Sequence, residues 1–319
     1  MAAAGTLARE IGEIPDLVAA RLGAMQDIAP IADAVRHFAP RFAVTIARGS
    51  SDAVAEGVAR AFGARLGLIT ASLPPSLVTL DRAALRWEGA LVLAISQSGR
   101  SPDLIEAARA ARDGGALVVG IINAPATPLA ACCTHVLPAG AYPEESVAAT
   151  KSVVLSWLSG LLLTELSADP AFDPASWAGL VPALRQAVTA DMGSAAAELD
   201  RPHALVLGRG AYLAVAKEIA LKLKELAGLP AEAISSAEVL HGPRAAVSAQ
   251  TAVLALGEVP DMAETLIALR RAGASVVAPE PLAPLVQLAS LYPLALALAR
   301  RRRRDADAPQ DLTKVTLTW

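Results

Sequence analysis

The sequence has few aromatic, cysteine and histidine side chains, and each scarcity excludes a class of protein. Aromatic residues make up 3% of the 319 positions and the net charge is −3, which argues against a nucleic-acid partner. Its two cysteines, Cys132 and Cys133, are adjacent and cannot form a disulfide framework or a four-ligand zinc site. None of the four histidines has a second ligand at metal spacing. We therefore expect a reducing compartment and no metal or other cofactor.

Long uncharged segments are also rare, and only one resembles a membrane span. Residues 281–299 carry no charge and precede the run Arg300–Arg304, a length and basic flank that fit a transmembrane helix. Pro293 lies inside the segment, where proline breaks or kinks a helix. We expect a buried helix with a solvated arginine end, with membrane attachment and an anion-binding arginine patch as alternatives. The N-terminus has no secretory signal pattern, so we expect a cytoplasmic protein without a membrane partner.

An apolar run that ends in a glycine turn and enters an alanine-rich helix occurs twice, at 42–51 and at 203–210. Further buried strands are expected at 90–95, 117–122, 134–137, 231–234, 252–256 and 274–277. Helices are expected at 52–66, 102–112, 150–166 and 212–227. This alternation predicts an α/β protein with two domains of one design, each a parallel sheet flanked by helices in a flavodoxin-like three-layer sandwich. The expected parts are an N-terminal helical segment (1–30), a first domain (31–170), a connector (171–200), a second domain (201–300) and a C-terminal tail (301–319).

Ligands of open parallel sheets bind at the carboxyl ends of the strands, so the loops there are candidate sites. Residues 48–51 (Arg-Gly-Ser-Ser) and 96–103 (Ser-Gln-Ser-Gly-Arg-Ser-Pro-Asp) offer hydroxyl groups and a helix N-terminus, which suit a phosphate. The alternative is that Ser98 or Ser101 only caps a helix.

Two further segments carry charged residues that could act chemically. Glu218, Lys222 and Glu225 share one helix face, a spacing typical of a solvated face but also of a carboxylate beside an ammonium for proton transfer. His241 precedes a Gly-Pro turn, where histidine can act as acid and base or be merely exposed.

These motifs, taken in order, resemble those of the tandem sugar isomerase (SIS) domain family. The matching segments are 49–51, 96–99, 144–151, 220–225 (Ala-Leu-Lys-Leu-Lys-Glu), 241–243 (His-Gly-Pro) and 312–316. The chain is similar to the isomerase half of glucosamine-6-phosphate synthase and to stand-alone deaminases of the same design. The resemblance implies a sugar phosphate as substrate and a homodimer with shared active sites.

The resemblance also implies a role for each matching position. Binding of the substrate and its phosphate is implied for Gly49, Ser50, Ser51, Ser96, Gln97, Ser98, Ser101, Glu144 and Val147. Glu225 would shuttle a proton between C2 and C1, and Lys222 would assist at the reacting oxygens. His241 would open the sugar ring from the neighbouring subunit, and Lys314 would close over the substrate.

The chain departs from the synthase pattern at Arg48, Arg100 and Ala149, where synthases often have cysteine, glutamate and serine. The motifs around the first two look more like those of the stand-alone members. Because the chain starts Met-Ala-Ala, we also expect it to lack the glutaminase part of the synthase. The sequence thus predicts a glucosamine-6-phosphate deaminase that forms fructose 6-phosphate and ammonia. Alternatives are another sugar-phosphate isomerase or deglycase, and a sensor that binds a sugar phosphate without turnover.

Overall fold

The computed structural model describes residues 5–257 and 262–314, which form two compact units. Unit 1 contains the chain up to Ile14, Glu145–Thr150 and Pro182–Leu312. Unit 2 contains Pro15–Glu144, Lys151–Val181 and the chain from Thr313 on. Each unit holds one parallel sheet with helices against it, which confirms the predicted fold class.

Unit 2 contains a five-stranded sheet with the order β2-β1-β3-β4-β5, and every neighbouring pair is parallel. Its strands are β1 (Phe42–Ile46), β2 (Thr70–Ser72), β3 (Ala90–Ser96), β4 (Leu117–Ile122) and β5 (His135–Pro138). All residues of β3 and β4 are buried, because these strands lie inside the sheet and need apolar side chains on both faces. The predicted strands of this half are confirmed to within a residue or two, but β2 was not predicted.

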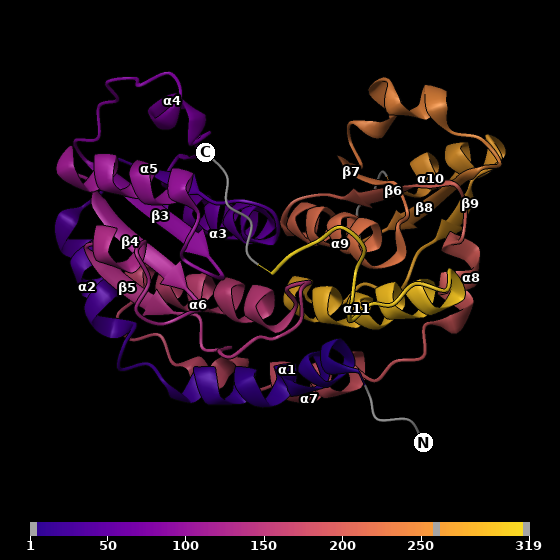
Figure 1. Ribbon diagram of the computed structural model, residues 1–319, viewed down its shortest axis with the longest axis horizontal. Coiled ribbons are helices and arrows are strands. Elements are labelled where there is room, and N and C mark those ends of the chain that lie inside the picture. The colour runs from indigo at the N-terminus through magenta and orange to yellow at the C-terminus, as the bar shows by residue number, and fades with distance from the viewer. Residues whose placement is uncertain (1–4, 258–261, 315–319) are drawn as a thin grey trace. The chain divides into compact units, whose positions relative to one another are not determined.

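Helices cover both faces of this sheet (Figure 1). The helices of unit 2 outside the boundary segments are α2 (Ala29–Phe38), α3 (Ser50–Leu66), α4 (Ser76–Thr79), α5 (Pro102–Asp113) and α6 (Lys151–Ala168), with 3-10 turns η1 (Ala130–Cys132) and η2 (Pro174–Trp177). On one face, alanines and a leucine of α5 form a core with β1, β3 and β4. On the other face, α6 packs against α2 and α3 and is buried over nearly its whole length.

Unit 1 contains a four-stranded parallel sheet with the order β7-β6-β8-β9. The strands are β6 (His203–Gly208), β7 (Ala231–Ser235), β8 (Thr251–Ala255) and β9 (Ser275–Val277). Its helices are α8 (Gly193–Leu199), α9 (Ala211–Ala227), α10 (Met262–Arg271) and α11 (Pro284–Arg301), with 3-10 turns η3 (Val239–His241) and η4 (Pro243–Ala246). Apolar residues of α10 pack on one face, whereas α9 and α11 pack together on the other. Two helices, α1 (Thr6–Gly23) and α7 (Leu180–Ala187), span boundaries between the units.

The two sheets repeat one design, as the duplicated sequence pattern predicts. In both, the first strand lies between the second and the third, and a helix follows the first strand. The residue before that helix is a glycine with nearly the same backbone angles, φ 54° and ψ −129° at Gly49 and φ 63° and ψ −131° at Gly210. A side chain at this positive φ would be strained, so both repeats use glycine there.

The apolar segment 281–299 corresponds to α11, which is mostly buried, as predicted. The helix continues through Pro293, so this proline does not end it as the sequence suggested it could. Among the described residues, no helix is both long and apolar enough to cross a membrane.

Part of the arginine run after this helix is used within unit 1. The Nε atoms of Arg301 and Arg302 lie 2.9 and 3.0 Å from the two carboxylate oxygens of Asp200. These arginines therefore bind the end of α11 to the turn before β6.

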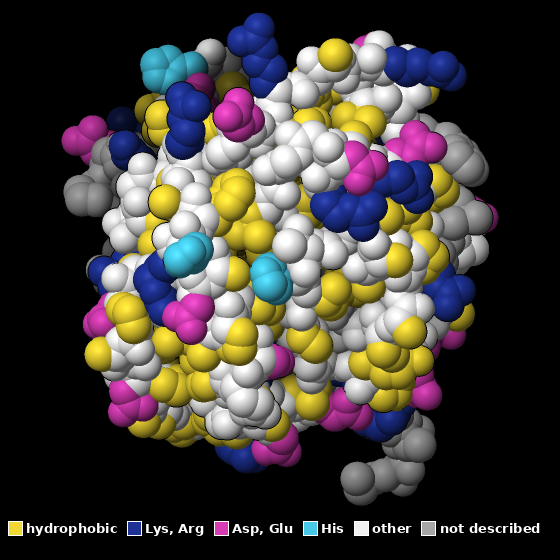
Figure 2. Space-filling view, turned by 90° about the vertical axis from the view of Figure 1, so that its left-hand side faces the viewer, with side chains coloured by type: hydrophobic (Ala, Val, Ile, Leu, Met, Phe, Trp, Pro, Cys, Tyr) yellow, Lys and Arg dark blue, Asp and Glu magenta, His cyan; other side chains and the backbone are white. Residues whose placement is uncertain are grey.

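On the surface shown in Figure 2, basic and acidic side chains are interspersed among apolar ones.

Candidate functional site

The two predicted phosphate loops lie at the point where the strand order of unit 2 reverses. β1 and β3 are neighbours in the sheet, but the chain runs outward from them in opposite directions, to β2 and to β4. Such a reversal opens a crevice at the carboxyl ends of the two strands, where ligands of this architecture bind. The loops after β1 and β3 carry the predicted serines, and each leads directly into a helix, α3 or α5. The N-terminal ends of two helices carry the positive ends of the helix dipoles, which suit an anion.

Hydrogen bonds fix the shape of the second loop. Ser96 is 5% exposed, and its Oγ accepts the backbone N–H of Gly99 at 2.9 Å. The backbone N–H of Arg100 donates to Ser98 Oγ at 3.4 Å. Ser101 is the N-cap residue of α5, yet its side chain makes no capping hydrogen bond. The capping alternative is therefore wrong for Ser101, and its hydroxyl is not used by the helix.

The corresponding loop of unit 1 lacks the two serines. There the Arg-Gly pair recurs as Arg209 and Gly210, but the next two residues are Ala211 and Tyr212 in place of Ser50 and Ser51. The loop after β1 in unit 2 is therefore better suited to phosphate than the loop after β6 in unit 1. The two repeats share a fold but differ in the side chains available to bind an anion.

Glu144 and Lys314, which the sequence singled out separately, form an ion pair in unit 2. Lys314 Nζ lies 3.1 Å from Glu144 Oε2. The Glu144 side chain is fully buried, and it also accepts the backbone N–H of Ser152 at 3.1 Å and the Ser152 hydroxyl at 2.7 Å. The carboxylate thus binds the first turn of α6 and the C-terminal tail at the same time.

The segment after Glu144 is held by a carboxylate that the sequence analysis did not single out. Glu10 of α1 is 1% exposed, and its two oxygens accept the backbone N–H groups of Glu145 at 2.6 Å and Ser146 at 3.2 Å. Arg9 forms an ion pair with the Glu145 side chain at 2.6 Å. The conformation of the segment that contains Val147 therefore depends on α1.

Lys222 and Glu225 also lie together, in unit 1. Lys222 Nζ donates a short hydrogen bond to Glu225 Oε2 and lies 3.5 Å from Glu218 Oε1. The side chains of Lys222 and Glu218 are 1% exposed, whereas that of Glu225 is 22% exposed. The interpretation of this face as solvated is therefore wrong, because the side chains of Lys222 and Glu218 are buried.

This burial changes what the three charges can do. A buried ammonium ion is stable only when it is paired, and Lys222 has two carboxyl groups beside it. Glu225 is the member that solvent reaches. The arrangement is therefore chemically suited to proton exchange at Glu225, next to a fixed positive charge on Lys222.

For two of the predicted site residues, His241 and Val147, the side-chain contacts do not indicate a role. His241 ends η3 and is exposed, and its backbone N–H donates to the carbonyl of Glu238 at 2.9 Å. Val147 is partly buried within 145–150. Within residues 5–257 and 262–314, neither side chain forms a hydrogen bond or ion pair, so the roles implied by the resemblance stay predictions.

An ion pair that the sequence did not predict joins the two predicted phosphate loops. Asp103, 1% exposed in the first turn of α5, accepts hydrogen bonds from Nε and Nη2 of Arg48 at 2.9 and 2.8 Å. Arginine followed by Gly-Ser-Ser, and Pro-Asp at a helix start, could have suggested a pair across neighbouring loops. No rule of spacing joins residues 55 positions apart.

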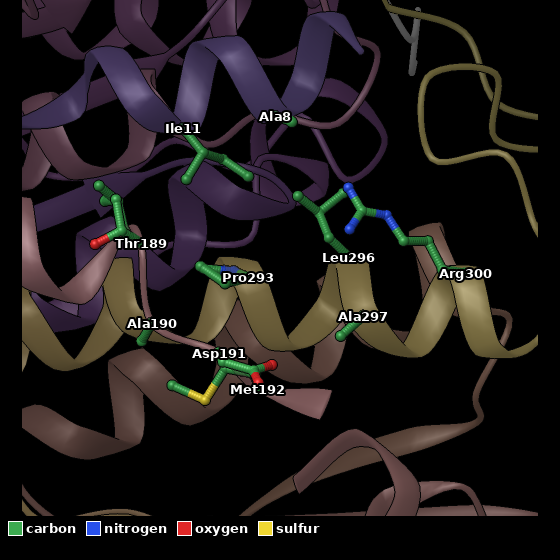
Figure 3. A pocket seen from close by; sticks show the side chains of 11 residues that line it. Ala8, Ile11, Thr189, Ala190, Asp191, Met192, Pro293, Leu296, Ala297 and Arg300 are labelled. Carbon is green, nitrogen blue, oxygen red and sulfur yellow. The ribbon is translucent and has the colours of Figure 1, made fainter. Parts of the chain in front are cut away.

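A separate hollow of about 230 Å³ lies in unit 1, between the start of α1 and α11 (Figure 3). Ala8, Ile11, Leu296 and Ala297 contribute an aliphatic lining, and Arg300 reaches over it. Pro293 also borders the hollow. None of the predicted site residues lines it.

The fold defines the chain as a protein of two repeated parallel α/β domains, with two serine-rich loops at the strand reversal of the first. The family comparison agrees: the SIS domain model matches residues 40–166 and 199–290. The chain belongs to the SIS domain family.

Curated relatives include the isomerizing glutamine–fructose-6-phosphate aminotransferases of Symbiobacterium thermophilum and Pyrobaculum aerophilum. The first is 36% identical, over 58% of this chain and 32% of the relative. The second is 32% identical, over 70% of this chain and 43% of the relative. The chain thus spans less than half the length of these relatives.

Solved structures extend the likeness over nearly the whole chain. A Silicibacter pomeroyi protein, provisionally described as a phosphosugar isomerase, is 38% identical with a TM-score of 0.87, covering 95% of this chain and all of the other. The glucosamine-6-phosphate deaminase of Thermotoga maritima has a TM-score of 0.79 at 20% identity, covering 98% of this chain and all of the other, and at that identity it shows the fold alone.

Proposed function

We propose that this protein is a phosphosugar isomerase of the SIS type, and that its substrate is glucosamine 6-phosphate. The observation that carries the proposal is the ion pair of Lys222 with the partly exposed Glu225 on a buried helix face. A protein that only bound a sugar phosphate would gain nothing from two buried charges beside a third, since their desolvation costs stability. The hydroxyl-rich loops of unit 2 supply the phosphate-binding function. The Silicibacter pomeroyi relative supports the broader class.

The reaction follows from the groups present. The loops hold the phosphate, far from C1 and C2, which fixes the orientation of the open-chain sugar. Glu225 takes the proton from C2 while the C1 oxygen gains one, which gives an enolamine. Glu225 then returns a proton to C1, so that C1 becomes a hydroxymethyl group and C2 an imine. Water adds to the imine and releases ammonia, which leaves fructose 6-phosphate.

Three other groups have supporting roles in this scheme. Lys222 stabilises the negative charge that develops on the substrate oxygens. His241 protonates the ring oxygen and so opens the pyranose, and Lys314 closes over the bound substrate from the C-terminal tail. The remaining groups bind the substrate without taking part in proton transfer: Gly49, Ser50, Ser51, Ser96, Gln97, Ser98, Ser101, Glu144 and Val147.

The direct test supplies glucosamine 6-phosphate and measures ammonia and fructose 6-phosphate by coupled assays. We expect both products in equal amounts from the wild-type protein and neither from Glu225→Gln, with binding of fructose 6-phosphate retained. Glu232→Gln, which changes an exposed glutamate on β7, is the matched control and keeps full activity. If another sugar phosphate is converted instead, the class stands and the substrate is wrong. Full activity of Glu225→Gln would refute the proton-transfer role.

We also infer a homodimer in which His241 acts in the site of the partner subunit. Mixing two inactive variants, Glu225→Gln and His241→Ala, tests this. With subunit exchange, half of the dimers are mixed and each holds one complete site, so activity returns to about a quarter of the wild-type value. If His241 acts within its own chain, mixing restores nothing.

A further inference from the structure

We infer that Arg48 is a positioning residue of the phosphate site, which sets the spacing of the two loops through its ion pair with Asp103. The inference rests on the proposed phosphate-binding function. Nε and Nη2 of Arg48 both donate to Asp103 Oδ2, at 2.9 and 2.8 Å. Arg48 follows β1 and directly precedes Gly49, whereas Asp103 lies two residues after Ser101. The pair therefore joins the two loops on either side of the strand reversal.

The two ends of this ion pair differ in environment. The side chain of Asp103 is 1% exposed, and its Oδ1 accepts the backbone N–H of Leu104 at 2.8 Å. The carboxylate is thus fixed within the first turn of α5. The Arg48 side chain is 49% exposed, at the surface. A buried carboxylate needs a paired cation, so the loop after β1 is drawn to a defined place relative to α5.

A defined spacing matters because a phosphate group is bound from several directions at once. The N-termini of α3 and α5 and the hydroxyls of both loops must reach oxygens of one small anion. If the loops moved independently, binding would require them to be ordered first, and this cost lowers affinity. Arg48 gives this order to the free protein. Its role is exerted through Asp103 and does not require contact with the substrate.

A matched pair of variants separates positioning from charge. Arg48→Met and Arg100→Met each remove one positive charge near the loops. Arg100 is exposed, and its side chain makes no hydrogen bond or ion pair within the part of the chain that the structure describes. Isothermal titration of the full-length proteins with fructose 6-phosphate, and with inorganic phosphate, measures Kd. We expect Kd to rise at least about tenfold for Arg48→Met and less than about threefold for Arg100→Met. If Kd rises equally in both variants, the loss of one positive charge explains the effect of Arg48→Met, and the inference is overturned.

A second variant deals with the charge that Arg48→Met leaves buried. In Arg48→Met/Asp103→Asn the buried charge is removed along with the link, so thermal stability recovers towards the wild-type value. If Arg48 acts by positioning the loops, the Kd of this double variant stays raised. The Kd of Arg48→Lys, which keeps one contact, should lie between those of the wild type and Arg48→Met. In turnover assays KM rises while kcat changes less than about threefold. A double variant that binds as tightly as the wild type would refute the role.

The outcomes also separate this inference from the proposed function. A wild-type protein that binds neither fructose 6-phosphate nor inorganic phosphate overturns the phosphate site and the inference with it. Binding by the wild type that is unchanged in Arg48→Met overturns the inference alone.

Discussion

Lys314 Nζ lies 3.1 Å from Glu144 Oε2, which joins two side chains that are 170 positions apart in the chain. Their environments differ: the Glu144 side chain is fully buried and that of Lys314 is 26% exposed. We therefore expect Glu144 to contribute mainly to stability and Lys314 mainly to activity.

Substitution of the two partners should therefore have different effects. Lys314→Met should lower kcat/KM for the sugar phosphate and lower the free energy of unfolding less than Glu144→Ala does, because the buried Glu144 carboxylate keeps its two hydrogen bonds from Ser152. Glu144→Ala should cost about 1–3 kcal/mol, since it removes the buried acceptor of both Ser152 hydrogen bonds. Urea unfolding and steady-state kinetics measure these effects. Equal destabilisation by both variants would contradict this account.

Lys222 should be essential to the folded state as well as to activity. Lys222→Met removes the ammonium group that lies between Glu218 and Glu225, and breaking a buried ion pair costs about 3–5 kcal/mol. The double variant Lys222→Met/Glu218→Gln should regain much of this stability, because the buried carboxylate is removed too, but it should remain inactive. Thermal unfolding and the ammonia assay check both expectations. A double variant less stable than Lys222→Met would show that Glu218 has other essential contacts.

The packing of α3 against α6 in unit 2 should tolerate alanine at one glycine and not at another. A Cβ atom at Gly57 would lie 2.4 Å from Cε2 of Trp157, which is buried, so Gly57→Ala should destabilise unit 2 by about 1–3 kcal/mol. Gly63→Ala, on the same helix, meets only the carbonyl of Leu68 at 3.8 Å and should stabilise the protein by about 0.5–1 kcal/mol. Urea unfolding of the two variants should give opposite signs. Equal values would mean that α6 shifts at no cost.

Cys133 should be slow to react at neutral pH. Burial raises the pKa of its thiol to about 12, the adjacent Cys132 adds to this effect, and Arg112 opposes it. A raised thiol pKa keeps the sulfur protonated, and only the thiolate is nucleophilic. The alkylation rate with iodoacetamide, followed by mass spectrometry, should thus rise about tenfold per pH unit from pH 7 to 10 without a plateau. The urea-unfolded chain is the control and should level off near pH 9. A plateau at that pH in the folded protein would contradict the raised pKa.

Sequence reasoning predicted the strands best where burial leaves little choice of side chain. β3 and β4 are continuous apolar runs because both of their faces are covered. β2 was missed because it is three residues long, lies at the edge of its sheet, and carries a threonine and a serine. Its place depends on backbone pairing with β1, which leaves no mark on its side chains.

The candidate site was predicted in pieces. Short motifs identified the phosphate loops and the charged face of α9, since each lies within one stretch of chain. The burial of Lys222 could not be predicted, because the spacing of charges along one helix does not show which of its faces the rest of the fold covers. The pairs Arg48–Asp103 and Glu144–Lys314 likewise depend on which segments folding brings together.

The division of the chain has a consequence for what a protease can do to it. The chain passes from one unit to the other after residues 14, 144, 150, 181 and 312. A single cut near η2 therefore produces two fragments that each supply residues to both units. The fragments should elute together in gel filtration under native conditions and separate only in denaturant. Neither unit therefore corresponds to one continuous stretch of the gene.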